Sequence, residues 1–113
     1  MDFLDRLSVA KKDGRPVALC IVIDTKGAVP RHAGSKMLVY GDGHTEGSVG
    51  GGDLEMITID SARESLKNGR TKIVTYSLVA DDPESVGVCG GEVTVYIEPQ
   101  VTQPILLILG GGH

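Results

Sequence analysis

Glycine is the residue that most constrains how this chain folds, because twelve of its sixteen copies gather at three places. The clusters lie at Gly41–Gly52, Gly87–Gly91 and Gly110–Gly112. Glycine adopts positive φ angles and lets other groups approach the backbone closely. The clusters also stand next to apolar runs that have the length of strands. We therefore expect short regular elements joined by glycine-rich loops, some of them suited to ligand contact.

Apolar periodicity predicts two helices and about six strands. The helices are expected at 2–12, where apolar residues recur at helical spacing and include Leu4, and from Asp53 to Asn68–Gly69. The strands are expected at 16–25, at 37–40, in a hairpin partner after the turn at 41–43, and at 71–79, 93–97 and 105–109. This order predicts a single α/β or mixed α+β domain with a mixed sheet.

Length and composition narrow the class of protein further. A chain of 113 residues forms one domain with a modest core, and its 41% hydrophobic and 23% charged residues are typical of a globular protein. A net charge of -4 gives no general attraction for nucleic acid or a membrane surface. The apolar runs are too short to span a bilayer, and the N-terminus is unlike a signal peptide. We expect a cytoplasmic protein, with no metal site of the CxxC or HExxH type.

The turn Gly47–Glu55 (GSVGGGDLE) passes directly into the second expected helix. The first amides of a helix lack intrahelical partners and carry partial positive charge, so Gly50, Gly51 and Gly52 are candidates to bind a phosphate or carboxylate. Ser48 adds a hydroxyl donor. The alternative is a tight turn that needs only glycine flexibility, with Asp53 as N-cap.

The loop Gly27–Met37 (GAVPRHAGSKM) holds a small cationic cluster. Arg31 can pair with an anion through its forked guanidinium group, and Lys36 can add a point charge. The alternative is a solvated turn whose charges face water.

The two cysteines lie in different surroundings and do not form a disulfide framework. Cys89 stands beside Gly90 and Gly91, so we expect its thiol to be accessible and available for sulfur transfer. The alternative is a small apolar side chain at the start of a strand. Cys20 lies inside an apolar run, where we expect it to be buried.

These segments together resemble the XdhC/CoxI family of xanthine dehydrogenase accessory factors. The resemblance rests on four pieces in order: GAVPRHAGSKM, GSVGGGDLE, CGGEVTVYIEP and PILLILGGGH. It implies an N-terminal XdhC/CoxI domain at 1–103, followed at 104–113 by the first strand of a truncated Rossmann-like domain. A dinucleotide site needs the helix after the glycine turn, so we expect no tight dinucleotide binding by this chain.

The resemblance also implies a function. Such a protein binds the molybdenum cofactor (molybdopterin) transiently, assists its sulfuration by a cysteine desulfurase, and delivers it to a molybdenum hydroxylase apoenzyme. We also expect a homo-oligomer. Carried over by position, the cofactor-binding residues are Arg31, Lys36, Ser48, Gly50, Gly51, Gly52, Glu55, Cys89, Gly90 and Gly91.

Two departures from the family pattern limit this inference. Asp53 stands where relatives often have cysteine, which removes a two-cysteine sulfur relay, and Ala28-Val29 replaces a small hydroxyl residue. The competing functions are an enzyme, either a sulfurtransferase carrying persulfide on Cys89 or a hydrolase or nucleotidyltransferase, and a pure interaction module. No Ser/His/Asp or P-loop signature supports independent hydrolysis. In the cofactor-binding reading, the three loops are expected to converge on one cleft beside the helix that starts near Asp53.

Overall fold

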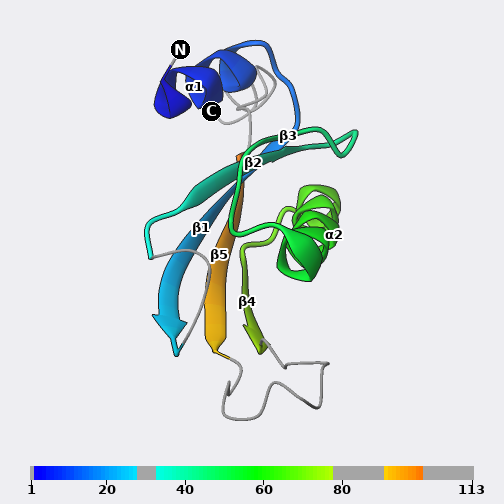
Figure 1. The fold of residues 1–113 in the computed structure, drawn as a ribbon. Helices are drawn as coiled ribbons and strands as arrows, with labels where there is room; N and C mark the ends of the chain where they lie inside the picture. Colours follow the sequence, from blue (N-terminus) through cyan, green and yellow to red (C-terminus); the bar gives the residue numbers. More distant parts are fainter. Residues whose placement is uncertain (1, 28–32, 78–90, 101–113) are drawn as a thin grey trace, which may run out of the picture.

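Two helices and a five-stranded sheet make up the described part of the chain, which in this computed structural model comprises residues 2–27, 33–77 and 91–100 (Figure 1). The elements are α1 (Phe3–Lys12), β1 (Val17–Lys26), β2 (Lys36–Tyr40), β3 (Thr45–Gly47), α2 (Gly52–Asn68), β4 (Lys72–Ser77) and β5 (Glu92–Gln100). The mixed α+β class and the two helices are confirmed. The sixth expected strand, at 105–109, lies outside the described residues.

The sheet has the order β3-β2-β1-β5-β4, and all four pairings are antiparallel. The described strands therefore form an antiparallel sheet and not the mixed sheet that the sequence predicts. Parallel strands need a long crossover connection, and α2 supplies one between β3 and β4. These two strands run in the same direction but form opposite edges of the sheet, so they never pair with each other.

The main core lies between α2 and one face of the sheet. Alternate strand residues point toward the helix, among them Cys20, Met37 and Val95, and all three are fully buried. From α2, Leu54 and Ala62 complete this core. Spacing of three to four residues places such side chains on one helical face, which is why the apolar pattern predicts α2 correctly.

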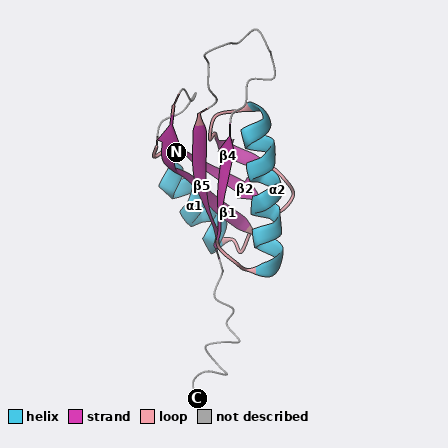
Figure 2. Ribbon diagram, turned by 90° about the horizontal axis from the view of Figure 1, so that it is seen from below, coloured by secondary structure: helices cyan, strands magenta, loops and turns pink. Residues whose placement is uncertain are grey.

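The helix α1 covers part of the opposite face of the sheet, so the two helices flank the sheet (Figure 2). Ala10 is buried there with Val17, Leu38 and Tyr40, while Phe3 and Leu7 pack against the rim of this cluster. Leu4 was expected on the same helical face but is 62% exposed. With only ten residues, α1 presents a narrow stripe to the sheet, and Leu4 lies outside it.

Pro99 continues β5 instead of ending it, contrary to the expected strand end at Ile97. It pairs with Ala18 on the β1 side, whereas the pairing of β5 with β4 stops at Ile97. Beyond Ile97, β5 is therefore an edge on its β4 side, where a residue without an N–H group is tolerated.

Among the described residues, no helix has the combination of length and apolar character that crossing a bilayer requires.

Candidate functional site

The glycine-rich turn begins with a close approach between β3 and β2. Gly47 has a φ of 80°, and a Cβ atom at this position would lie 2.5 Å from the carbonyl oxygen of Lys36. The next amide, that of Ser48, donates a hydrogen bond of 3.2 Å to the same oxygen. Glycine is therefore required at position 47, and the turn is anchored to the first residue of β2.

A small polar network then closes the turn onto the start of α2. The hydroxyl of Ser48 donates to Oε2 of Glu55 at 2.6 Å and accepts from the amide of Gly50 at 3.1 Å. The same Glu55 oxygen accepts from the amide of Gly51 at 2.9 Å. Glu55 thus folds back to cap its own helix, as the acidic residue of a capping box does. In this conformation the amides of Gly50 and Gly51 have an internal acceptor, and the carboxylate occupies a place where an anion would bind.

Three amides at the start of α2 come before the hydrogen-bond ladder of the helix. The first hydrogen bond of the helix runs from the amide of Glu55 to the carbonyl of Gly51, so the amides of Gly52, Asp53 and Leu54 precede the regular ladder. A Cβ atom on Gly51 or Gly52 would meet nothing within 4 Å. Gly52 and Asp53 are exposed whereas Leu54 is buried, and Asp53 and Glu55 make the surroundings of these amides acidic.

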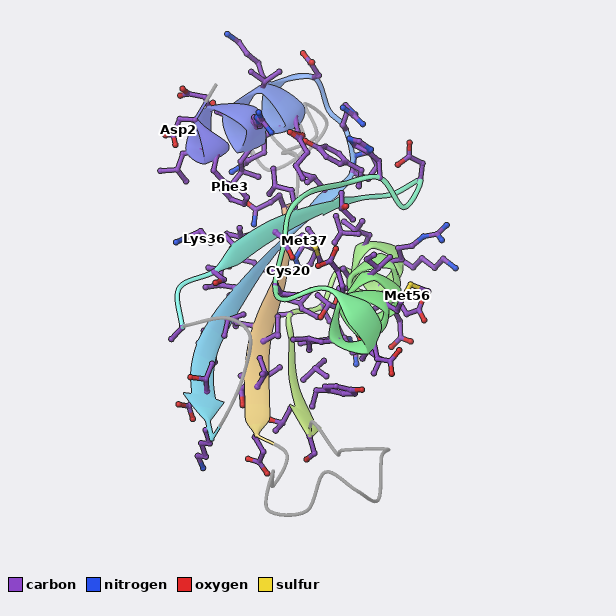
Figure 3. All side chains as sticks on the ribbon, in the orientation of Figure 1. Asp2, Phe3, Cys20, Lys36, Met37 and Met56 are labelled. Carbon is purple, nitrogen blue, oxygen red and sulfur yellow. The ribbon has the colours of Figure 1, made fainter. Side chains whose placement is uncertain are left out.

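Only the backbone of Lys36 lies next to this turn, and its side chain does not. Its ammonium group donates to the carbonyl of Gly34 at 3.0 Å. Met37 packs in the α2 core and Leu38 in the α1 cluster, so the alternation of β2 puts Lys36 on the α1 face. Its side chain points away from α2 (Figure 3). The structure therefore does not bring the Lys36 charge to the helix start.

The predicted convergence of three loops can be followed only in part. Ser48, Gly50–Gly52 and Glu55 come together, whereas Gly91 is buried at the beginning of β5. Tyr96 and Lys36 both pair with Ile21, and Gly91 precedes Tyr96 by five residues. At about 3.3 Å per residue, Gly91 lies roughly 16 Å along the sheet from Lys36.

The remaining predicted site residues, Arg31, Cys89 and Gly90, lie outside the described residues and stay predictions.

Cys20 is fully buried in the α2 core, as predicted. Burial raises the pKa of its thiol to about 12, because the thiolate would lose its hydration. This thiol is protonated at neutral pH and inaccessible, so it is unsuited to carry sulfur. Within the described ranges, no group of three or more His, Cys, Asp or Glu side chains is placed to hold a metal ion.

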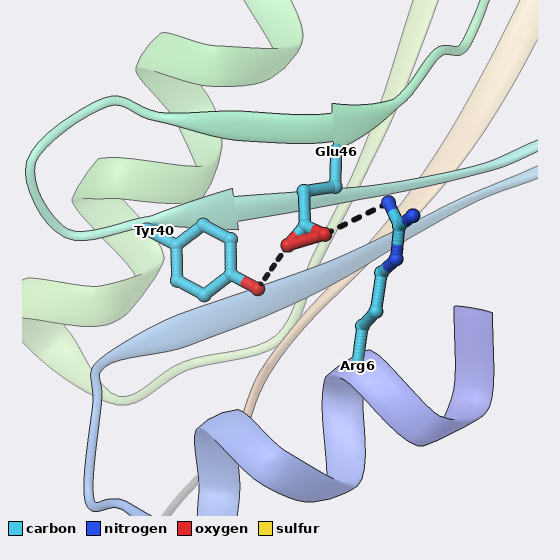
Figure 4. Close-up of polar contacts among 3 residues, drawn as sticks. All are labelled: Arg6, Tyr40 and Glu46. Atoms are coloured by element: carbon cyan, nitrogen blue, oxygen red, sulfur yellow. Dashed lines mark hydrogen bonds and ion pairs between the residues drawn. The ribbon is translucent and has the colours of Figure 1, made fainter. Parts of the chain in front are cut away.

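A second polar cluster, which the sequence does not predict, lies on the α1 face of the sheet. Glu46 accepts a 2.6 Å hydrogen bond from the hydroxyl of Tyr40 and forms a 3.0 Å ion pair with Arg6 (Figure 4). The hydrogen bond from Tyr40 and the charge of Arg6 lower the pKa of Glu46. Burial and the bond to Glu46 raise the pKa of Tyr40 to about 12. Arg6 and Glu46 are forty positions apart, so no local pattern could have revealed this cluster.

Comparison with known proteins relates the chain to one family. The model of the XdhC and CoxI family matches residues 10–77, which is more than half of the chain and ends before Cys89. The protein YqeB of Escherichia coli (strain K12) is 28% identical over 114 residues, which cover 100% of this chain and 21% of YqeB. The crystal structure of a xanthine dehydrogenase from Bacillus halodurans matches with a TM-score of 0.70 and 27% identity, over 88% of this chain and 30% of that one. The chain thus spans less than a third of the length of either relative.

Proposed function

This chain belongs to the XdhC and CoxI family, and from that premise we propose that it is an accessory factor of a xanthine dehydrogenase-like enzyme. Membership of the family is the observation that carries the proposal. The likeness to a Bacillus halodurans chain described as a xanthine dehydrogenase points to the same pathway. Such an accessory factor prepares its client enzyme and does not itself carry out the client's redox reaction.

The finer proposal is that the protein binds the molybdenum cofactor (molybdopterin) transiently. The cofactor brings a phosphate and a molybdenum centre that must receive a terminal sulfido ligand. The amides of Gly52, Asp53 and Leu54, with the open space in front of Gly51, fit an anionic group of this kind. The acidic side chains nearby call for a cation as well, a role that the family resemblance gives to Arg31.

Glu55 would act as an internal substitute for the bound anion. Its carboxylate holds Ser48 and Gly51 in the absence of ligand, and rotation of the side chain would release both donors. The exchange of one anion for another would keep these partly buried donors satisfied in both states, and so avoid the cost of leaving a donor without an acceptor. The cradle could then hold and release its ligand without unfolding the start of α2.

A sulfur-transfer role within this proposal falls to Cys89 alone. Cys20 is excluded by its burial and raised pKa, and Asp53 stands where a second thiol would be needed. Cys89, with Gly90 and Gly91, would lie near the molybdenum end, since a soft sulfur suits that metal. The proposed partners are a cysteine desulfurase, a molybdenum hydroxylase apoenzyme and a second copy of the protein.

Mass spectrometry after expression in cells that make the cofactor tests the binding proposal. We expect the protein, in its full-length context, to co-purify with the cofactor. Arg31→Ala should weaken binding by about 1.5–3 kcal/mol, the usual contribution of a charged hydrogen bond. Lys11→Ala is the matched control, because it removes an exposed charge from the last turn of α1. Equal retention of cofactor by Arg31→Ala and wild type would reject the assigned anion site.

Reconstitution of an apo-dehydrogenase separates sulfuration from binding. Cys89→Ala should retain most of the cofactor but fail to support a sulfurated, active client. If Arg31→Ala and Cys89→Ala both reconstitute the client as well as wild type does, the proposed site is wrong. Activity lost by Cys89→Ala and restored when sulfide is added would assign the thiol to sulfur delivery.

A further inference from the structure

A second candidate binding site lies on the face of the sheet opposite the glycine-rich turn. The helix α1, the segment that follows it and the β2–β3 hairpin enclose a cavity of about 340 Å³. Its walls include the apolar side chains of Val9 and Ala10, the ring of Tyr40 and the guanidinium group of Arg15. Four of its seven lining residues are charged, and such converging polar groups beside an apolar wall can orient a small molecule.

The backbone holds Arg15 rigidly at the mouth of this cavity. At the end of α1, the amide of Gly14 donates to Lys11 and the amide of Arg15 donates to Ala10. These two bonds, with a φ of 73° at Gly14, form a Schellman motif. On the other side, the carbonyl of Pro16 accepts from the amide of Gly41. Arg15 is therefore fixed between α1 and the end of β2.

The side chain of Arg15 is also oriented before any ligand binds. Its guanidinium carbon lies 4.1 Å from the centroid of the Tyr40 ring, a cation–π contact. The hydroxyl of Tyr40 is held by Glu46, which is held in turn by Arg6 (Figure 4). Such a supported arrangement lowers the entropic cost of binding, because few side-chain rotations remain to be lost.

The charges of the cluster leave Arg15 without an ion pair among the described residues. Asp42 borders a neighbouring cavity, and the pKa of its carboxyl is lowered by the hydrogen bond from the amide of His44 and also by the charges of His44 and Arg15. Both carboxylate oxygens of Glu46 are engaged, one by Tyr40 and one by Arg6, so the charge of Arg6 is neutralised. The ion pairs within the described ranges involve other residues than Arg15. Arg15 is an exposed residue and also borders two further cavities, of about 380 and 370 Å³.

We propose that this cavity binds a small organic anion, with its carboxylate or phosphate on Arg15 and its apolar body against Val9 and Ala10. The planar fork of arginine suits both anionic groups. Asp13 also lines the cavity and repels negative charge, so a ligand with a single anionic group is favoured over a polyanion. The site does not depend on the cofactor proposal, because it lies on the other face of the sheet.

The competing explanation is that Arg15 and Tyr40 only fasten α1 to the sheet. NMR titration of the 113-residue chain with benzoate and with phenyl phosphate distinguishes the two, with benzyl alcohol as the uncharged probe. We expect saturable chemical-shift changes of the amides of Val9–Arg15 and Tyr40–Glu46, with a dissociation constant of about 1 mM. The anion that binds more tightly identifies the preferred group.

Arg15→Gln should weaken binding of the better anion roughly tenfold to hundredfold, the loss expected for a charged hydrogen bond. Its melting temperature should fall by only a few degrees, because the substitution removes one exposed cation–π contact worth about 0.5–1 kcal/mol. Arg63→Gln, which removes an exposed charge from α2, should bind like wild type. The proposal is overturned if neither anion gives saturable shifts or if benzyl alcohol binds as tightly as the anions. It is also overturned if Arg15→Gln binds the better anion as tightly as wild type does.

Discussion

Replacement of Glu55 by alanine tests whether this side chain caps α2 from within. The change removes two hydrogen bonds to one carboxylate oxygen, from the hydroxyl of Ser48 at 2.6 Å and the amide of Gly51 at 2.9 Å. Both donors are only partly buried, so water replaces part of what is lost. Loss of a helix cap costs about 0.5–2 kcal/mol, and the negative charge adds a further ~0.3–1 kcal/mol through the helix dipole. We expect the free energy of unfolding to fall by about 1–2 kcal/mol.

Urea and thermal unfolding measure this loss, and Asp53→Ala supplies the matched control. Asp53 lies in the same first turn and carries the same charge, so its removal should cost only the dipole contribution of about 0.3–1 kcal/mol. For a domain of roughly this size, Glu55→Ala should lower the melting temperature by about 4–12 °C. If the two variants lose the same stability, Glu55 acts through its charge alone and the capping argument fails.

The same variant reports on the anion cradle. Removal of the Glu55 carboxylate exposes the amide of Gly51 to an external anion and lowers the local negative charge. A ligand that binds only the folded state raises stability by RT ln(1 + [L]/Kd). Phosphate should therefore raise the melting temperature of Glu55→Ala more than that of wild type. An equal rise in both proteins would show that Glu55 does not compete with anions for this place.

Four further substitutions, one of them a control, test other parts of the structure. Gly47→Ala should cost more than about 2 kcal/mol of unfolding free energy in urea, because its Cβ would lie 2.5 Å from a β2 carbonyl and its φ is positive. Gly69→Ala, at a left-handed position with open space around its Cβ, should cost only about 1 kcal/mol. Ser65→Ala should raise the free energy of unfolding by up to about 1 kcal/mol, because the buried hydroxyl of Ser65 has no hydrogen-bond partner among the described residues. A fall in the free energy of unfolding by more than about 1 kcal/mol would show that the hydroxyl has a partner. Tyr40→Phe should cost about 1 kcal/mol at pH 7. Because the folded-state pKa of Glu46 is lowered, its contribution to stability is present above about pH 4.3 and disappears as the pH falls through the folded value. The difference in unfolding free energy between wild type and Tyr40→Phe should therefore narrow in unfolding curves measured toward pH 3. A difference that stays constant with pH would argue against the coupling of Tyr40 to Glu46.

Local sequence patterns predict the regular elements well. Each helix buries a stripe at helical spacing, and Gly69 ends α2 in the left-handed conformation that glycine favours. The apolar run around Cys20 becomes the central strand β1, which buries this residue completely. These features depend on neighbours within a turn or a strand, and such neighbours are visible in the sequence.

The candidate site depends on distances that the sequence does not contain. A cationic Lys36 close to a glycine-rich turn suggests an anion site, but the position of Lys36 in β2 puts its charge on the other face of the sheet. A shift of one residue in a strand reverses the side on which a side chain lies. Glu55 satisfies the predicted α2 cradle internally, a role that composition alone does not reveal.

By itself, the sequence determined the α+β class, the bounds of most elements, the burial of Cys20 and the family to which the chain belongs. Only the tertiary structure decided that the described sheet is wholly antiparallel and that Arg6, Tyr40 and Glu46 meet across forty residues. The physical reason is the range of the interactions. Propensity and amphipathic spacing act between near neighbours, whereas strand order and side-chain clusters depend on contacts that form only when distant segments pack together.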